Sequence, residues 1–210
     1  ALDDISFQVE SGSIFGLVGS NGAGKSTFLR TASGVYKPDM GGVAIDGFKP
    51  FENTAVKGKS CFISDYPYFP RTATIDDLAD LFSHTYPGWD KDLFEKLCAC
   101  FPLDRKQRVN NMSKGMQRQA AILCALGARP THLLLDEIFD RLDPVMRQLL
   151  KRILSGEVSE RGMTIVIASH NLRELEDICV DVGLFHRGGV VFDRDLDDLK
   201  LGIRRVQAVF

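Results

Sequence analysis

The sequence predicts an α/β fold in which a mainly parallel sheet carries helices on both faces. Short apolar runs with the length of strands alternate along the chain with segments of helical periodicity, which is typical of such sheets. The runs at 14–18, 133–135 and 164–168 are apolar almost throughout, so we expect both faces of these strands to be buried. A chain of 210 residues accommodates one large domain with a smaller subdomain inserted.

The N-terminal part is expected to add an antiparallel β-subdomain. Apolar and polar residues alternate over 5–9, which indicates a half-buried strand, and a further antiparallel strand is expected over 43–46. A helix is expected over 25–32, with Gly34 placed to end it. A short strand is expected over 61–64.

The segment from about 72 to 128 predicts a mostly helical insert, because apolar residues recur there at helical spacing. After this insert, we expect helices over 145–154 and 172–179 and a hairpin between 184 and 192. We therefore interpret the whole chain, 1–210, as a single domain that contains the helical insert.

The composition excludes several classes of protein. Hydrophobic residues make up 44% of the chain and the formal net charge is -2, which suits a globular core and provides no general attraction to nucleic acid. The five cysteines are scattered, so we expect buried reduced thiols in a cytosolic protein rather than a disulfide framework. No run reaches the ~18 apolar residues that a membrane span needs, and no signal peptide opens the chain.

A glycine-rich segment at 19–27 lies between a predicted strand and a predicted helix, which is the setting of a phosphate-binding P-loop. Its glycines let the backbone turn tightly, so that N–H groups and a helix N-terminus can face phosphate oxygens. Lys25 is expected to reach the β- and γ-phosphates, and the Ser26 hydroxyl to bind Mg²⁺. The alternative is a simple glycine-rich turn. The predicted nucleotide-binding residues here are Gly19, Asn21, Gly22, Ala23, Gly24, Lys25, Ser26 and Thr27.

Two acidic residues follow the apolar run 133–135. If that run is a parallel strand, Asp136 and Glu137 lie at the carboxyl edge of the sheet, where ligands bind in α/β folds. Asp136 suits Mg²⁺, directly or through water, and Glu137 suits a general base that polarises an attacking water. Alone, such a pair is more often a helix cap, but its combination with a P-loop favours the catalytic interpretation.

His170 comes directly after the predicted strand 164–168. We expect that strand to run parallel to the one that precedes Glu137, so the imidazole could contact the γ-phosphate and sense its hydrolysis. A lone histidine at such a position is otherwise a structural residue.

Together, these segments resemble the ABC transporter ATPases over essentially the whole chain. Residues 19–27 resemble the Walker A motif of that family, 133–137 resemble Walker B, and His170 resembles the switch histidine. The strings 140–147 and 169–176 are similar, more narrowly, to bacterial ATPases of multidrug or peptide-antibiotic exporters. The family's signature motif is similar to Met112-Ser113-Lys114-Gly115-Met116. Its D-loop is similar to Phe139-Asp140-Arg141-Leu142-Asp143.

The resemblance implies a homodimer, or a pair of ATPase subunits, that meet head to tail with two ATP molecules between them. Ser113 and Gly115 of one chain would then bind the γ-phosphate held by the P-loop of the other, because a helix N-terminus forms a second anion-binding surface. In catalysis, Mg²⁺ and Lys25 would offset charge, Glu137 would orient water and His170 would hold the γ-phosphate. Without its neighbours, the signature segment is an ordinary helix cap.

The chain departs from the family at three places. The glutamine of the family's Q-loop corresponds to Asp65, which could approach Mg²⁺ through water or be a plain turn residue. Lys114 and Met116 stand where a glycine and a glutamine are common in the signature. The aromatic residue that stacks on adenine in the family lies upstream of Ala1, and we expect residues to precede Ala1 in the natural protein.

The function implied by the resemblance is that of the ATP-hydrolysing subunit of a bacterial transporter, peripheral on the inner face of the cell membrane. It implies a separate transmembrane permease, and the exporter-like strings favour export. There are two alternatives. One is an ABC ATPase that moves no solute, but its long coiled coils or second fused cassette do not fit within 210 residues. The other is a nucleotide-gated binding module with little turnover, which Asp65 allows and which Glu137 and His170 argue against. Most aromatic residues near the Q-loop and the insert are expected in the core, with a few available to the permease: Tyr66, Tyr68, Phe69, Phe82, Tyr86 and Trp89.

Overall fold

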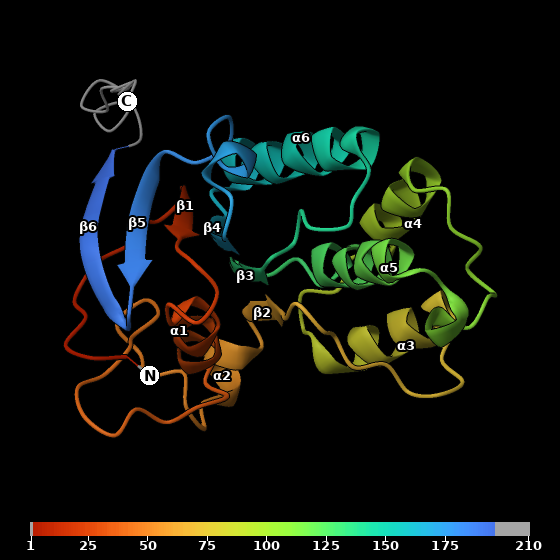
Figure 1. Ribbon diagram of the computed structural model, residues 1–210. Coiled ribbons are helices and arrows are strands. Elements are labelled where there is room, and N and C mark those ends of the chain that lie inside the picture. Colours follow the sequence, from red (N-terminus) through yellow and green to blue (C-terminus); the bar gives the residue numbers. More distant parts are fainter. Residues whose placement is uncertain (1, 196–210) are drawn as a thin grey trace, which may run out of the picture.

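A computed structural model describes residues 2–195, and its centre is a six-stranded sheet in the order β2-β3-β4-β1-β5-β6 (Figure 1). The first five strands in this order pair in parallel, and β6 pairs antiparallel with β5, so the predicted mainly parallel sheet is confirmed. The strands are β1 (Ile14–Val18), β2 (Ser60–Ile63), β3 (His132–Asp136), β4 (Thr164–Ser169), β5 (Asp181–His186) and β6 (Gly189–Asp195).

α-Helices lie in the connections from β1 to β2, from β2 to β3 and from β3 to β4. Before β2 lie α1 (Lys25–Ala32) and the short α2 (Thr54–Lys57), and α6 (Pro144–Arg161) connects β3 to β4. In Figure 1, the helices between β2 and β3 lie together beyond the β2 edge of the sheet. This segment is helical as predicted, with α3 (Ile75–Thr85), α4 (Lys91–Cys100), a 3-10 turn at Val109–Asn111 and α5 (Lys114–Gly127).

Both faces of the sheet are buried. Along β3, Leu133 and Leu135 belong to one hydrophobic cluster and Leu134 belongs to another, because successive side chains of a strand point to opposite faces. The cluster around Leu134 includes Leu29 of α1, and the other cluster includes side chains of α5 and Leu150 of α6. The three-layer arrangement predicted from the apolar runs is therefore present.

Local sequence signals set several helix boundaries. The predicted end of α1 is confirmed, since Gly34 follows it with a φ of +71°. Thr74 and Asp77 form a reciprocal capping box at the start of α3. Asp143 caps α6, and Gly162 ends this helix with a φ of +67°.

The two segments predicted as antiparallel strands do not form a ladder. Side chains over 5–9 alternate between half-buried and exposed, as predicted, but no strand is assigned there within residues 2–195. Around 43–46, pairing is limited to one bridge between Ile45 and Phe48. Alternation indicates which side chains face the core, whereas a strand also needs a hydrogen-bonded neighbour along its length.

The predicted helix 172–179 is reduced to a 3-10 turn at Leu172–Glu174 followed by turns. The chain leaves the helical path because the N–H of Val180 donates to the carbonyl of Ile14 (3.0 Å), which aligns the next residues with β1 as β5. The hairpin predicted between 184 and 192 is confirmed by the pairing of β5 with β6.

No helix in the described part of the chain is long and apolar enough to cross a membrane. The five cysteines are free thiols, of which Cys61, Cys124 and Cys179 are buried as expected. Cys98 is half-buried and Cys100 is exposed, so the expectation of burial was wrong for Cys100, which lies in the last turn of α4.

Candidate functional site

Four neighbouring parallel strands end at the candidate site. β1 leads into the P-loop at 19–27, and β2 is followed by Asp65. β3 ends at Asp136 and continues into Glu137, and His170 follows β4. Because β2, β3, β4 and β1 are adjacent in this order, their carboxyl ends meet along one edge of the sheet. The topology therefore brings together predicted site residues that lie far apart in the sequence.

The backbone of the P-loop adopts conformations that favour glycine. Gly22 has a φ of +82°, and Gly24, the N-cap of α1, has a φ of +111°. Gly19 is required for a different reason, since a Cβ there would lie 2.4 Å from the carbonyl oxygen of Phe185. Gly24 has no side chain that could cap α1, so the first N–H groups of this helix are open to an anion.

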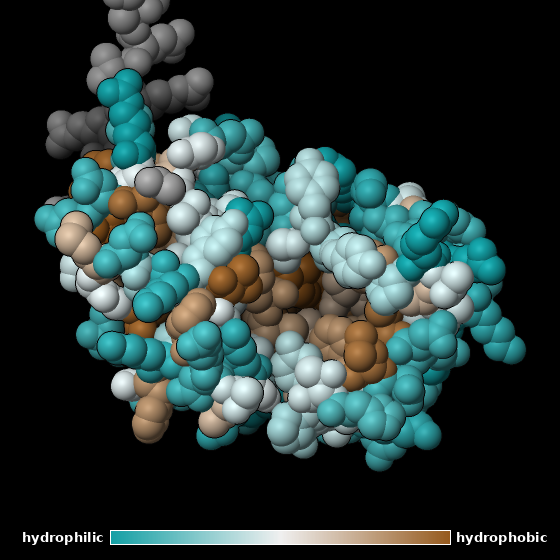
Figure 2. Space-filling model, turned by 90° about the horizontal axis from the view of Figure 1, so that it is seen from below, coloured by the Kyte–Doolittle hydropathy of each residue, from teal (hydrophilic) through white to brown (hydrophobic). Residues whose placement is uncertain are grey.

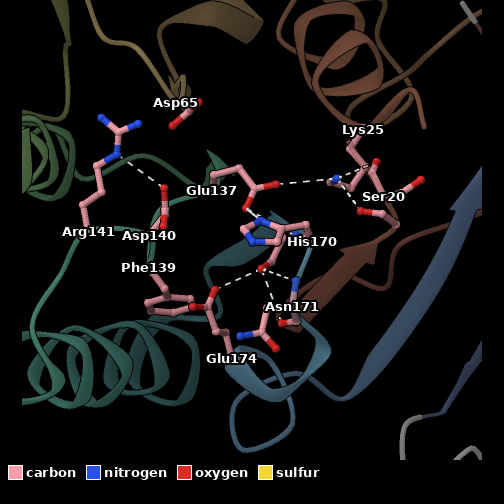
Figure 3. A network of polar contacts seen from close by, with 12 residues as sticks. Ser20, Lys25, Asp65, Glu137, Phe139, Asp140, Arg141, His170, Asn171 and Glu174 are labelled. Atoms are coloured by element: carbon pink, nitrogen blue, oxygen red, sulfur yellow. Dashed lines mark hydrogen bonds and ion pairs between the residues drawn. The ribbon is translucent and has the colours of Figure 1, made fainter. Parts of the chain in front are cut away.

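Lys25 is buried and its ammonium group is held inside the site. Its Nζ donates to the carbonyl oxygens of Gly19 (2.6 Å) and Ser20 (3.3 Å). The same Nζ lies 3.5 Å from Oε1 of Glu137, a contact that Figure 3 shows as a dashed line. The positive charge thus lies between the P-loop carbonyls and the carboxylate that follows β3.

Glu137 connects Lys25 with His170 (Figure 3). While Oε1 faces the lysine, Oε2 accepts a hydrogen bond from the backbone N–H of His170 (3.3 Å) and lies 2.9 Å from its Nδ1. The backbone of Glu137 has a φ of +51°, which is uncommon for a residue other than glycine, and its N–H donates to the carbonyl of Ala168 (2.9 Å). The direction of the carboxylate is therefore fixed by His170, which follows β4, and by Lys25 of the P-loop.

The imidazole of His170 is about half exposed and is electrostatically coupled to Glu137. The hydrogen bond to the Glu137 carboxylate, and then the negative charge of that group, raise the pKa of His170 above its ordinary value. Partial burial acts in the opposite direction, and the more distant carboxylates of Glu174 and Asp140 add to the rise. The structure thus favours the protonated imidazole next to Glu137.

His170→Ala is expected to destabilise the nucleotide-free protein more at pH 5.5 than at pH 9. A pKa that is raised by folding stabilises the folded state fully below the unfolded pKa, and this contribution disappears as the pH rises through the folded pKa. Because the His170 side chain is half exposed, we expect a loss of only about 0.5 kcal/mol at the lower pH. Urea unfolding at both pH values measures the difference, with His186→Ala as control. An equal loss at both pH values would contradict the coupling.

Asp136 is the most deeply buried acidic group of the site. It is 1% exposed, and among the described residues no donor makes a hydrogen bond of normal geometry to either carboxylate oxygen, although the Ser26 hydroxyl lies beside them. Burial raises the pKa of Asp136 above its ordinary value, whereas the neighbouring Ser26 hydroxyl lowers it. A desolvated carboxylate that lacks a well-formed hydrogen bond is best satisfied by a cation, so Asp136 and Ser26 have the chemistry of a divalent-cation site.

Asp65 lies beside this site but is engaged elsewhere. Its Oδ1 accepts a hydrogen bond from Nη2 of Arg118 (2.5 Å), and its carbonyl oxygen accepts from the same nitrogen (2.8 Å). A metal ion would have to compete with this guanidinium for the carboxylate. The predicted approach of Asp65 to Mg²⁺ therefore has a competing ion pair that sequence reasoning missed.

Arg118 itself was not among the predicted site residues. It lies in α5, and its side chain is 3% exposed. The available signal was an arginine within a helix otherwise rich in buried apolar residues, because a buried guanidinium needs acceptors to satisfy its donors. The sequence alone does not show which acceptors these are.

The predicted signature and D-loop residues have local structural roles within the single chain. Ser113 caps α5 by accepting a hydrogen bond from the N–H of Met116 (3.3 Å), and Asp143 caps α6 in the same way. A Cβ on Gly115 would lie 2.6 Å from the carbonyl oxygen of Arg141, so this glycine lets α5 approach the D-loop closely. Among residues 2–195, no hydrogen bond joins the signature segment to the P-loop.

Comparison with known proteins decides the family. Residues 2–140 match the family model described as ABC transporter. Over 209 residues, 100% of the chain, the sequence is 31% identical to the ABC transporter ATP-binding protein YtrB of Bacillus subtilis (strain 168), of which it covers 72%. This chain belongs to the ABC transporter family. Membership confirms the predicted family and the predicted enzyme class, an ABC-type ATPase.

Solved structures of the ABC transporter family share the fold. An ATP-binding subunit of an ABC transporter superposes with a TM-score of 0.87 at 27% identity, covering 95% of this chain and 85% of that one. A dimeric ATP-binding cassette in a post-hydrolysis state, bound to ADP and Pi, superposes with a TM-score of 0.82 at 21% identity, covering 93% of this chain and 90% of that one. The predicted P-loop α/β fold is thereby confirmed. Names of further relatives include both import and export proteins.

Proposed function

We propose that the chain is the ATP-hydrolysing subunit of a bacterial ABC transporter, in which 72–128 form an inserted helical subdomain. The observation that carries this proposal is the line of contacts from Lys25 through Glu137 to His170, together with the buried carboxylate of Asp136. Such an arrangement places a cation, a general base and a second polar group around one position next to a P-loop. A site that only binds phosphate needs no carboxylate at the place of Glu137.

ATP would be held by the open N–H groups at the start of α1 and by Lys25. The lysine ammonium is already desolvated and directed into the site, so it could exchange the carbonyls of Gly19 and Ser20 for phosphate oxygens. Ser26 and Asp136 would hold Mg²⁺, which supplies positive charge at the phosphates. Asp65 joins this set only if Arg118 releases its carboxylate.

Hydrolysis would depend on Glu137 as general base. Its Oε1 and Oε2 have separate partners on the P-loop and after β4, and this fixes the carboxylate that accepts the proton of the attacking water. With Nδ1 of His170 directed at Glu137, the opposite ring nitrogen is available for the γ-phosphate. We assign His170 to holding that phosphate rather than to accepting the proton.

A second chain would complete each ATP site. Ser113 and the N-terminus of α5 would form an anion-binding surface, and within 2–195 this surface makes no hydrogen bond to the P-loop of its own chain. We therefore propose that ATP is held between the P-loop of one chain and Ser113 and Gly115 of another, as homodimer or paired subunit. The fold of this chain is shared by a cassette whose structure is dimeric.

The transmembrane permease would bind the surface around the segment that follows β2. Tyr66 is 68% exposed, Tyr68 is 87% exposed and Leu81 of α3 is 53% exposed, whereas Phe69 is buried. Seen from below, the molecule is mostly hydrophilic, and hydrophobic side chains gather in a hollow near the middle of this face (Figure 2). Large apolar groups left on a surface are typical of partner contacts. The chain would then lie on the cytoplasmic face of the cell membrane.

We propose export as the direction of transport. This rests on the strings 140–147 and 169–176, which resemble exporter ATPases. The names of relatives include both directions and do not add to this choice.

The proposed function is tested by measuring phosphate release and dimerisation together. With ATP and Mg²⁺, we expect saturable phosphate release whose rate per chain rises with protein concentration, because two chains complete the site. Sedimentation of the same samples should show ATP-dependent dimers. Saturable ATP binding without phosphate release at any protein concentration would instead support the nucleotide-gated binding module.

A further inference from the structure

We propose that Arg118 is a positioning residue for Glu137, through which the first turns of α5 control the geometry of the hydrolytic site. The inference rests on the proposed function, ATP hydrolysis with Glu137 as general base. It adds a residue outside the recognised motifs and gives Asp65 a different role from that of a metal ligand.

The guanidinium of Arg118 joins the ends of two neighbouring strands. Its Nη1 donates to the carbonyl oxygens of Glu137 and Asp140, the latter at 2.7 Å. Its Nη2 donates to Oδ1 (2.5 Å) and to the carbonyl oxygen of Asp65 (2.8 Å). One buried group on α5 thus fixes both the segment after β2 and the segment after β3. Only the planar fork of an arginine offers parallel donors at this spacing.

The bond to the Glu137 carbonyl acts on a backbone that needs support. Glu137 has a φ of +51° and Arg141, four residues later, has a φ of +65°. Residues other than glycine remain in this region only where their surroundings hold them there. Glu137 is held on one side by its N–H bond to Ala168 and on the other by Arg118. Removal of the guanidinium frees one of these two restraints and lets the carboxylate turn away from its partners.

The position of Arg118 in α5 connects this restraint with the surface at Ser113 that would bind the ATP of a second chain. The helix begins just after Ser113, and Arg118 lies little more than one turn further on. In the same turn, Gly115 lies against the carbonyl of Arg141. A displacement of the N-terminus of α5 by a ligand at Ser113 would therefore move the support of Glu137. Binding of phosphate to the signature segment of one chain would in this way alter the position of Glu137 in that same chain.

Asp65 completes the arrangement by neutralising Arg118. A guanidinium with almost no exposure needs a counter-ion as well as carbonyl acceptors, and Asp65 is the carboxylate in contact with it. The negative charge that distinguishes Asp65 from the glutamine of related Q-loops is thus explained by Arg118. Loss of either partner is expected to disturb the same carboxylate, Glu137.

Kinetics of matched variants test this inference. Arg118→Met is expected to lower kcat by about 100-fold through misplacement of Glu137. Its ATP affinity, measured in the Glu137→Gln background, should stay within about threefold of the parent value. Arg118→Lys keeps the positive charge without the planar guanidinium, so its kcat should lie between those of the parent and Arg118→Met. Asp65→Asn should also lower kcat.

The matched control is Arg161→Met. Arg161 also bonds a carboxylate, Glu157, and a backbone carbonyl, Pro130, but at the opposite end of the sheet. If Arg118 acted only through stability, both variants would lose activity in parallel with their melting temperatures. We expect Arg161→Met to keep kcat within about threefold at a temperature at which it is folded. A kcat of Arg118→Met equal to that of Arg161→Met would overturn the proposal, as would an undiminished kcat in Arg118→Lys and Asp65→Asn if Arg118→Met does not fold.

Amide hydrogen exchange separates this inference from the proposed function. The amides of 137–142 should exchange about tenfold faster in Arg118→Met than in the parent, while those of β1 remain unchanged. This readout needs no turnover. A parent chain that releases no phosphate would contradict the proposed function, and unchanged exchange over 137–142 would contradict the positioning role.

Discussion

Glu137→Gln is expected to lower the rate of ATP hydrolysis by about 10²–10⁴-fold, because the amide cannot accept the proton of the attacking water. The amide oxygen can still accept the hydrogen bond from the N–H of His170, and the side chain keeps its size. The P-loop and Lys25 are unchanged, so ATP binding persists. Since ATP then stays intact between two chains, the variant should accumulate as an ATP-bound dimer.

Phosphate release and sedimentation in the presence of ATP and Mg²⁺ measure both parts of this expectation. Glu160→Gln, which removes an exposed carboxylate near the end of α6, is the control for loss of charge. Full hydrolysis by Glu137→Gln would show that another group accepts the proton. A variant that neither hydrolyses ATP nor dimerises with it would place Glu137 in binding instead.

The elements best predicted from the sequence are those whose signal is local. The runs 14–18, 133–135 and 164–168 became β1, β3 and β4 because strands buried on both faces must be apolar throughout. The P-loop could be found from its own residues, since the tight turn needs glycine at 22 and 24. Once these strands are parallel neighbours, Asp136, Glu137 and His170 have to meet at one edge.

The features that sequence reasoning missed depend on contacts between distant segments. The alternation over 5–9 identifies the buried side chains but not a pairing partner, and no ladder forms there in the described chain. The helix expected over 172–179 is cut short because Val180 pairs with the start of β1. In the same way, the ion pair of Asp65 with Arg118 joins residues 53 positions apart, and no local pattern indicates it.

Lys25→Met is expected to weaken ATP binding as well as to abolish most hydrolysis, and this distinguishes it from Glu137→Gln. A hydrogen bond to a charged group contributes about 1.5–3 kcal/mol, so the Kd for ATP should rise roughly 10- to 150-fold. Methionine has a similar helix propensity, so α1 should persist. Titration calorimetry measures the Kd, with Lys59→Met, an exposed lysine before β2, as control.

Comparison of Lys25→Met with Glu137→Gln distinguishes phosphate binding from the activation of water. Nζ of Lys25 contacts both the Gly19 carbonyl and Glu137, so its charge could serve either purpose. If the Kd of Lys25→Met stayed at the parent value while hydrolysis fell, the ammonium group would remain with Glu137 when ATP binds. A raised Kd means that the ammonium transfers to the phosphates, which leaves Glu137 free to act on water.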